Sequence, residues 1–121
     1  MAIAEQFFGE LPVGNAFILQ MNTPQFPFLL VAPTMRIPGN VSKTINAYLA
    51  MRALLIAIIQ HNASHEKQIK SIAISGFCSG VGGMFPEESA SQMRIAYDMI
   101  IGEQWKRIVH PALAPYAMRN E

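Results

Sequence analysis

Apolar residues gather in three short runs that predict strands. The first two are Ala16–Met21 and Phe28–Ala32, and the second is apolar at every position, as strands covered on both faces are. The third is Ile69–Ser75, with the sequence Ile-Lys-Ser-Ile-Ala-Ile-Ser. Because Pro33 cannot donate a hydrogen bond to a sheet, the second strand is expected to end before it.

Two longer segments carry the spacing of helices. The first is expected over Lys43–His61, with Ser42 as its cap, and its broad apolar stripe predicts that it is largely buried. The second starts at Pro86, which suits the first turn of a helix, and extends toward Val109. The stripes consist of Ile45, Leu49, Leu55 and Ile59 in the first helix, and of Met93, Tyr97, Ile100 and Trp105 in the second.

The order of these elements is strand, strand, helix, strand, helix. A long helix between two strands is what a right-handed crossover between parallel strands requires. We therefore expect an α/β fold with a mostly parallel sheet flanked by helices, formed by a single domain over residues 1–121. A short helical turn is expected over Met1–Phe8, and an irregular tail over about residues 111–121, where Pro111 and Pro115 stop a helix.

The composition narrows the class of protein. Hydrophobic residues make up 51% of the chain and charged residues 14%, against about 25% charged in an average soluble domain, so disorder is excluded. The longest apolar run, Ala53–Ile59, is shorter than the ~20 residues of a membrane-spanning helix. With a net charge of +1 and no visible leader, we expect a cytoplasmic protein that binds neither nucleic acid nor membrane. The low charge content predicts a homo-oligomer, with apolar surface buried between copies.

The glycine-rich stretch Gly76–Phe85 is the most informative about function. It lies between a predicted strand and a predicted helix, which is where open α/β sheets bind ligands. A glycine-rich backbone can point several N–H groups into one concavity, and beside a helix start such a concavity suits phosphate. The same glycines also permit a tight turn without any ligand, and this alternative stays open.

Three segments of the chain resemble a known family. The stretch Gly80–Ala90 looks like the second phosphate-binding loop of macro domains, which are ADP-ribose-binding modules. Bacterial and phage macro-domain-like proteins also carry segments similar to Ala32–Arg36, Asn46–Ala53 and Gly76–Met84, in this order. The resemblance covers about Gly9–Asp98 and implies a partial three-layer, Rossmann-like macro fold that lacks the family's N-terminal portion.

The resemblance also implies a site. Backbone N–H groups of the loop would hold the diphosphate of ADP-ribose or a related nucleotide, while Val81 and Met84 pack against the adjoining ribose. Cys78 replaces a glycine of the family, and the family's early strands, which supply an acidic residue for adenine, have no counterpart. Binding without catalysis and without a cofactor is therefore implied. The ligand-binding residues are Cys78, Ser79, Gly80, Val81, Gly82, Gly83 and Met84.

Two other functions stay open on the residues alone. The first is a structural or interaction protein whose pocket binds nothing. The second is a hydrolase, because Gly76–Gly80 fits a Gly-x-Cys-x-Gly nucleophile elbow with Cys78 as nucleophile and His61, His65 or His110 as base. Against this, the helix starts several residues after the cysteine rather than directly behind it, so its dipole is poorly placed to lower the thiol pKa.

Histidine spacing and single arginines are weaker signals. His61 and His65 are four residues apart, as zinc ligands on one helix face are, but no third ligand is recognisable. We therefore expect them to interact with a helix C-terminus, and we expect no metal site. Arg36 and Arg52 are expected to be solvated or paired rather than bound to phosphate.

Overall fold

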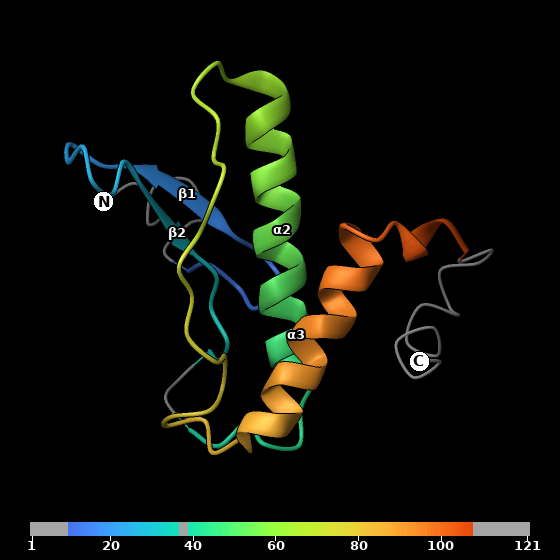
Figure 1. Ribbon diagram of the computed structural model, residues 1–121. Helices are drawn as coiled ribbons and strands as arrows, with labels where there is room; N and C mark the ends of the chain where they lie inside the picture. Colours follow the sequence, from blue (N-terminus) through green and yellow to red (C-terminus); the bar gives the residue numbers. More distant parts are fainter. Residues whose placement is uncertain (1–9, 37–38, 108–121) are drawn as a thin grey trace.

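The computed structural model describes residues 10–36 and 39–107. A hairpin of two strands lies on one side of a long central helix, and a second helix lies on the other side (Figure 1). Both helices begin at the same end of the molecule (Figure 1). The elements are β1 (Phe17–Gln20), β2 (Phe28–Val31), α2 (Asn46–Ser64), α3 (Pro86–Ile100) and the 3₁₀ helix η1 (Gln104–Arg107).

The sheet has two antiparallel strands, and the expectation of a mostly parallel, Rossmann-like sheet is wrong. Phe17 lies opposite Val31, and Gln20 lies opposite Phe28. The connection over residues 21–27 makes a hairpin, closed by a hydrogen bond of 2.8 Å from the Met21 N–H to the Pro27 carbonyl. A parallel neighbour needs a crossover of about a dozen residues or more, so this short connection permits only the antiparallel arrangement.

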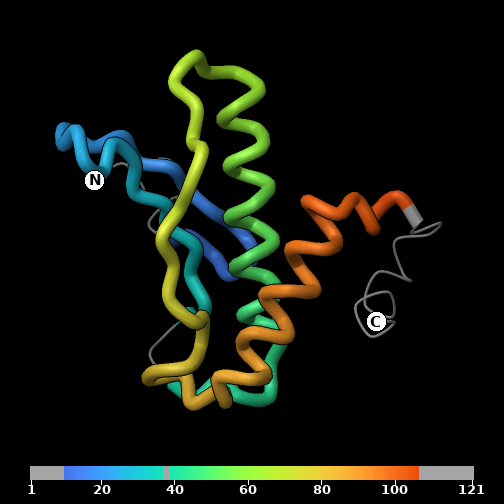
Figure 2. The backbone as a smooth tube through the Cα atoms, in the orientation of Figure 1, coloured from blue at the N-terminus to red at the C-terminus, as the bar shows by residue number. Residues whose placement is uncertain are grey.

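The third predicted strand, Ile69–Ser75, is extended but is not part of the sheet. It returns along α2 from the end of that helix toward the start of α3 (Figure 2). Its first residue is held by the Asn62 side chain, which accepts from the Ile69 N–H at 2.8 Å and donates to the Ile69 carbonyl at 2.9 Å. The sheet therefore stops at β2 among the described residues.

Helix α2 starts later than predicted, and Ser42 is not its cap. The Ser42 N–H and hydroxyl both donate to the Asn40 side-chain oxygen, so Ser42 belongs to the preceding turn. Ile45 occupies the cap position without a side-chain hydrogen bond. The N-terminal half of α2 is buried, whereas Ile59 near its end is 47% exposed, so the expected burial holds for half of the helix.

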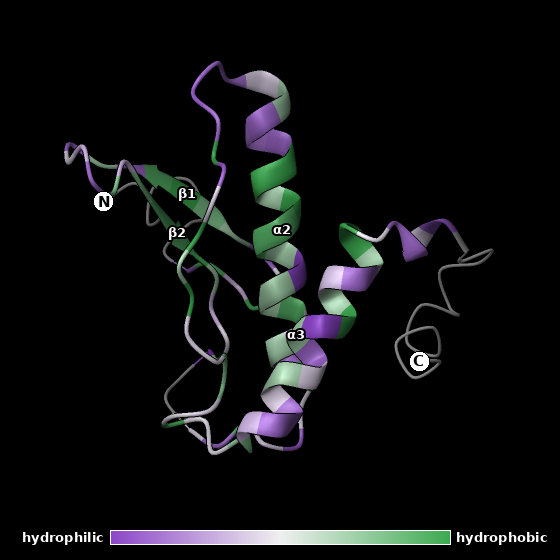
Figure 3. Ribbon diagram, in the orientation of Figure 1, coloured by the Kyte–Doolittle hydropathy of each residue, from purple (hydrophilic) through white to green (hydrophobic). Residues whose placement is uncertain are grey.

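Helix α3 begins at Pro86 as predicted but ends at Ile100, well before Val109. Gly102 and Glu103 follow, and Glu103 has a positive φ of 57°, which interrupts the helical backbone. The buried face also differs from the predicted stripe, because Tyr97 and Trp105 are exposed. Hydrophilic and hydrophobic residues are interspersed along the ribbon of α3 (Figure 3). Its buried residues are Ser89, Gln92, Ile95, Ala96 and Met99.

The core forms where α3 crosses the N-terminal half of α2. Seven buried residues from these two helices form one cluster, and Leu30 and Ala32 of the strand side pack against it. Gln92 is 1% exposed and joins the helices, because its side chain accepts from the Tyr48 N–H at 3.2 Å and donates to the Thr44 carbonyl at 2.9 Å. The seven are Tyr48, Met51, Leu54, Leu55, Ile95, Ala96 and Met99.

The turn expected over Met1–Phe8 and the tail expected over 111–121 lie outside the described residues. Within residues 10–36 and 39–107, no helix combines the length and the apolarity that crossing a membrane requires.

Candidate functional site

The glycine-rich loop 76–85 leads from the extended segment into α3, at the end of the molecule where both helices begin (Figure 2). Its backbone closes on itself through hydrogen bonds from Gly83 N–H to Gly80 carbonyl at 3.1 Å and from Met84 N–H to Cys78 carbonyl at 2.9 Å. It is fastened to the loop before α2, because the Val41 N–H donates to the Gly82 carbonyl at 2.8 Å. The loop therefore has a defined conformation, which hydrogen bonds within the loop and to Val41 hold in place.

Two of the glycines are required by packing. A Cβ atom at Gly82 would lie 2.5 Å from the Cys78 carbonyl oxygen and 2.8 Å from a methyl of Val41. Gly83 has a φ of +73°, and a Cβ there would lie 2.6 Å from the Asn40 side-chain nitrogen. The purely conformational explanation therefore accounts for these two positions, whereas a Cβ at Gly80 would meet no atom within 4 Å.

The loop presents only part of the predicted binding set to solvent. Val81 is 78% exposed, and Gly80 and Gly83 are exposed with it. Met84 is 2% exposed and packs with Val41, so its side chain is directed into the core rather than toward a ribose. Cys78 and Gly82 are buried as well, and Ser79 is half-buried, with its hydroxyl donating to the Gly76 carbonyl at 2.7 Å.

The exposed turn of the loop keeps backbone donors available. The loop's own backbone hydrogen bonds use the N–H groups of Ser79, Gly83 and Met84. The N–H groups that they leave unused include those of the exposed residues Gly80 and Val81. These two successive donors lie on the exposed outer turn, a few residues before the N-terminus of α3. Successive N–H groups near a helix start attract anions, whereas the two acidic residues in the first turn of α3 oppose them.

Cys78 lies in an environment that suits a structural thiol. It is 5% exposed, has a positive φ of 66°, and packs beside Ala47 in the first turn of α2. Burial raises the pKa of the Cys78 thiol above its ordinary value, and a hydrogen bond with the Thr34 side chain acts in the opposite direction. A raised pKa leaves little thiolate, which is the nucleophilic form.

The histidines proposed as bases lie far from this thiol. His61 is near the C-terminal end of the 19-residue helix α2, whose first turn contacts Cys78, and such a helix spans about 28 Å. His65 stacks on His61 with ring centroids 4.2 Å apart, and His110 lies outside the described residues. The described residues therefore do not assemble a nucleophile with a base.

The two histidines serve to fasten the end of α2. His61 Nε2 donates to the Lys67 carbonyl at 2.9 Å, and the His61 ring meets the Phe28 ring edge-on at 4.8 Å. Among the residues that the structure describes, no three side chains of metal-ligating type come together. Arg36 is exposed and pairs with Glu10 at 3.1 Å, and Arg52 is exposed.

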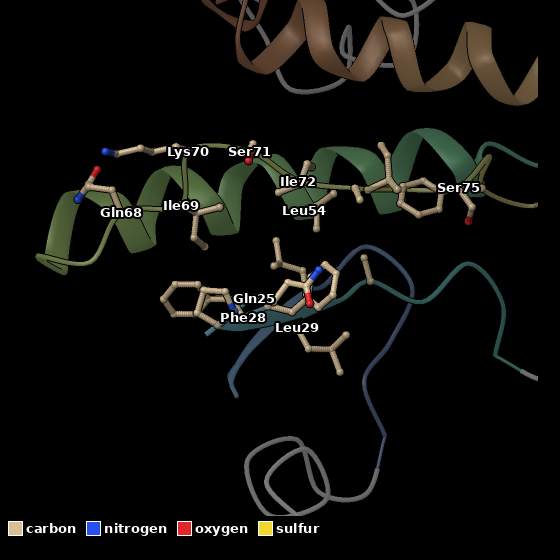
Figure 4. Close-up of a pocket in the computed structure, with 17 residues that line it drawn as sticks. Gln25, Phe28, Leu29, Leu54, Gln68, Ile69, Lys70, Ser71, Ile72 and Ser75 are labelled. Carbon is tan, nitrogen blue, oxygen red and sulfur yellow. The ribbon is translucent and has the colours of Figure 1, made fainter. Parts of the chain in front are cut away.

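Sequence reasoning missed a cavity on the other side of α2. It measures about 800 Å³ and lies between the hairpin and the extended segment 68–75 (Figure 4). Leu54 of α2 lies between the two sides, which carry Phe28, Leu29, Ile69 and Ile72 (Figure 4). The signal was present as two apolar runs, but the prediction that they pair in one sheet concealed the space between them.

One known protein is similar in sequence to the chain. An uncharacterised protein of Aeropyrum pernix shares 31% identity with it over 99 residues, which are 82% of this chain and 49% of that protein. The chain therefore spans about half the length of this relative. No known protein family matches the chain, and no solved structure matches it.

Proposed function

We propose that the chain is a non-catalytic binding module whose glycine-rich loop holds the diphosphate of ADP-ribose or a related nucleotide. The observation that carries this proposal is the exposed outer turn, where the N–H groups of Gly80 and Val81 are left over by the loop's own hydrogen bonds. Anionic oxygens accept hydrogen bonds from such donors at low cost, because the turn is already fixed by its bonds to Cys78 and Val41.

Two exposed apolar side chains support a nucleotide rather than a simple anion. Val81 and Phe85 are 78% and 77% exposed, on either side of the turn that leads into α3. A ribose or a base lying against them would remove apolar surface from water, which contributes about 25 cal/mol per Å². A free phosphate gains nothing from these side chains, so the two ligand classes differ in affinity.

Calorimetry tests this function. We expect ADP-ribose to bind the wild-type chain and inorganic pyrophosphate to bind more weakly. In Val81→Asp the new carboxylate lies beside the diphosphate, so affinity for ADP-ribose is expected to fall about tenfold or more, which corresponds to at least 1.4 kcal/mol. In Val81→Asn, a side chain of similar size without charge, the loss is expected to be smaller.

Two results contradict the proposal. One is the absence of ADP-ribose and ADP binding at millimolar concentration. The other is equal affinity in wild type and Val81→Asp, which would place the ligand away from the loop.

A homo-oligomer is a second proposal, supported by α3. Tyr97 and Ile101 are four residues apart and share a face of the helix end, and they are 44% and 43% exposed. Trp105 in η1 adds a third large side chain, 51% exposed. Exposed apolar surface of this kind is typical of interfaces between copies.

A further inference from the structure

The cavity between β2 and the extended segment has unpaired backbone on both sides. β2 is an end strand of a two-stranded sheet, so its second edge has no partner strand among the described residues. On the other side, residues 70–75 are exposed and make no backbone hydrogen bond to any described residue. Every such residue carries a donor and an acceptor that need a partner once water is removed.

The segment 69–75 is also suited to a strand by composition. Ile69, Ile72 and Ile74 are β-branched, and such residues favour extended backbone that packs against neighbouring strands. Its start is fixed by the two hydrogen bonds to Asn62, and its end is fixed by the glycine-rich loop. The segment is therefore held extended at both ends and remains open along its length.

The charge of the lining specifies what enters the cavity. Among the 17 lining residues Lys70 is the one that carries a charge, and the remainder are apolar residues, glutamines and serines. Ile72 and Ile74 of the lining are 37% and 43% exposed, so part of its apolar surface remains in contact with solvent. Away from Lys70, a charged group of the occupant would lose hydration here without gaining an oppositely charged partner.

We propose that this cavity is a docking groove for an extended, uncharged segment of another polypeptide, about six residues long, which adds as a strand between β2 and residues 69–75. Such a strand pairs with backbone on both of its edges, and its apolar side chains reach Leu54 and Phe77. Two strand spacings, about 9–10 Å, then separate β2 from the segment. This site is separate from the exposed turn of the glycine-rich loop.

Segment 69–75 of a second copy does not suit this position when it lies parallel to its counterpart. This segment runs along α2, as Figure 4 shows, and would bring that helix with it. Interleaving the two segments in parallel, with both helices on one face, would place the two α2 helices about one strand spacing apart, near 5 Å. Packed helices need 8–10 Å between their axes, so this arrangement favours an occupant without a covering helix.

Fluorescence anisotropy with a labelled peptide tests the groove. The probe is the peptide Lys-Val-Thr-Val-Thr-Val-Thr-Lys, and its partner probe carries N-methyl groups on the valines, which remove donors from one edge. We expect the first peptide to bind and the methylated peptide to bind at least tenfold more weakly, which is about 1.4 kcal/mol. Amide exchange at residues 70–75 is expected to slow on addition of the first peptide.

Two matched variants locate the binding. Ile74→Lys places a charge in the groove and is expected to weaken peptide binding at least tenfold. Ile59 is exposed to a similar degree, 47% against 43%, but does not line the cavity, so Ile59→Lys is expected to bind the peptide as wild type does. Neither substitution is expected to change ADP-ribose binding, so this proposal and the nucleotide proposal fail independently.

Three results would overturn the groove proposal. The first is no binding of either peptide at millimolar concentration. The second is equal binding of the two peptides or of wild type and Ile74→Lys. The third is a dimer, seen by sedimentation, that Ile74→Lys dissociates and Ile59→Lys does not, because a second copy would then be the occupant.

Discussion

Replacing Gly82 with alanine tests whether the glycine-rich loop is packed and rigid in the folded chain. The added Cβ would lie 2.5 Å from the Cys78 carbonyl oxygen and 2.8 Å from Val41. Neither neighbour is the far end of a flexible side chain. The carbonyl accepts a hydrogen bond from Met84, and Val41 donates its own N–H to Gly82, so the loop cannot make room without disturbing these bonds.

The magnitude follows from these contacts. Forcing extra volume into a packed site costs about 1–3 kcal/mol, and weakening one of the two hydrogen bonds adds about 1 kcal/mol. We expect the free energy of unfolding of Gly82→Ala to fall by about 3 kcal/mol. For a chain of 121 residues this lowers the melting temperature by about 10 °C.

Urea unfolding followed by circular dichroism measures the change, with Gly80→Ala as the control. A Cβ at Gly80 meets nothing within 4 Å, so this variant is expected to unfold within about 0.5 kcal/mol of wild type. Equal stability of the two variants would refute the reasoning. It would mean that the loop is loose enough to admit a side chain anywhere, and that its hydrogen bonds add no rigidity.

The remaining predictions concern the thiol and the interface. Because burial raises the pKa of Cys78 and limits access to it, iodoacetamide at pH 8 is expected to alkylate the folded chain about a hundredfold more slowly than the urea-unfolded chain, and equal rates would contradict the described burial. The rate in the folded chain is expected to rise as pH increases past 9, since the raised pKa delays formation of the thiolate. If α3 carries the contact between copies, Ile101→Lys is expected to convert an oligomer into a monomer in sedimentation velocity, whereas a wild-type monomer at micromolar concentration would remove that proposal.

Local patterns in the sequence located the elements with useful accuracy. Phe28–Val31 falls within the predicted second strand, and Pro86 opens α3 as its backbone chemistry requires. The end of α2 was harder, because Asn62 and Ser64 are polar residues typical of a turn, yet their side chains bond to Ile69 and to the Gln60 carbonyl and extend the helix to Ser64.

The sequence did not predict in the same way which strands pair with one another. The run Ile69–Ser75 has the composition of a strand, and it is extended, but composition does not specify a partner. The short connection 21–27 did carry part of the needed information, since it excludes a parallel pairing of the first strand with the second. The order of elements favoured a crossover and so led to the wrong sheet.

For the candidate site too, the sequence predicted one part and did not reveal another. The sequence located the glycine-rich loop but did not reveal all of the reasons why Gly82 and Gly83 are needed. Besides the nearby Cys78 carbonyl, their constraints come from Val41 and Asn40, some forty residues away in the chain. The same applies to Met84, whose burial depends on the loop before α2. Residues with exposed side chains, such as Val81, are the part of the site for which the sequence-based interpretation stays open.

The Gln92 side chain has a consequence for the order in which the chain folds. The cap residue of helix α2, Ile45, makes no side-chain hydrogen bond, and Thr44 Oγ1 accepts locally from the Asn46 N–H at 3.2 Å. The Tyr48 N–H and the Thr44 carbonyl bond instead to Gln92, which lies 44 residues from Tyr48 and 48 residues from Thr44. Closing a loop of that length loses chain entropy before the contact is made. The hydrogen bonds at the start of α2 are therefore complete only when α3 arrives. A helix that forms early along most of its length acquires its first turn late, and the two helices gain their final boundaries in a single cooperative step.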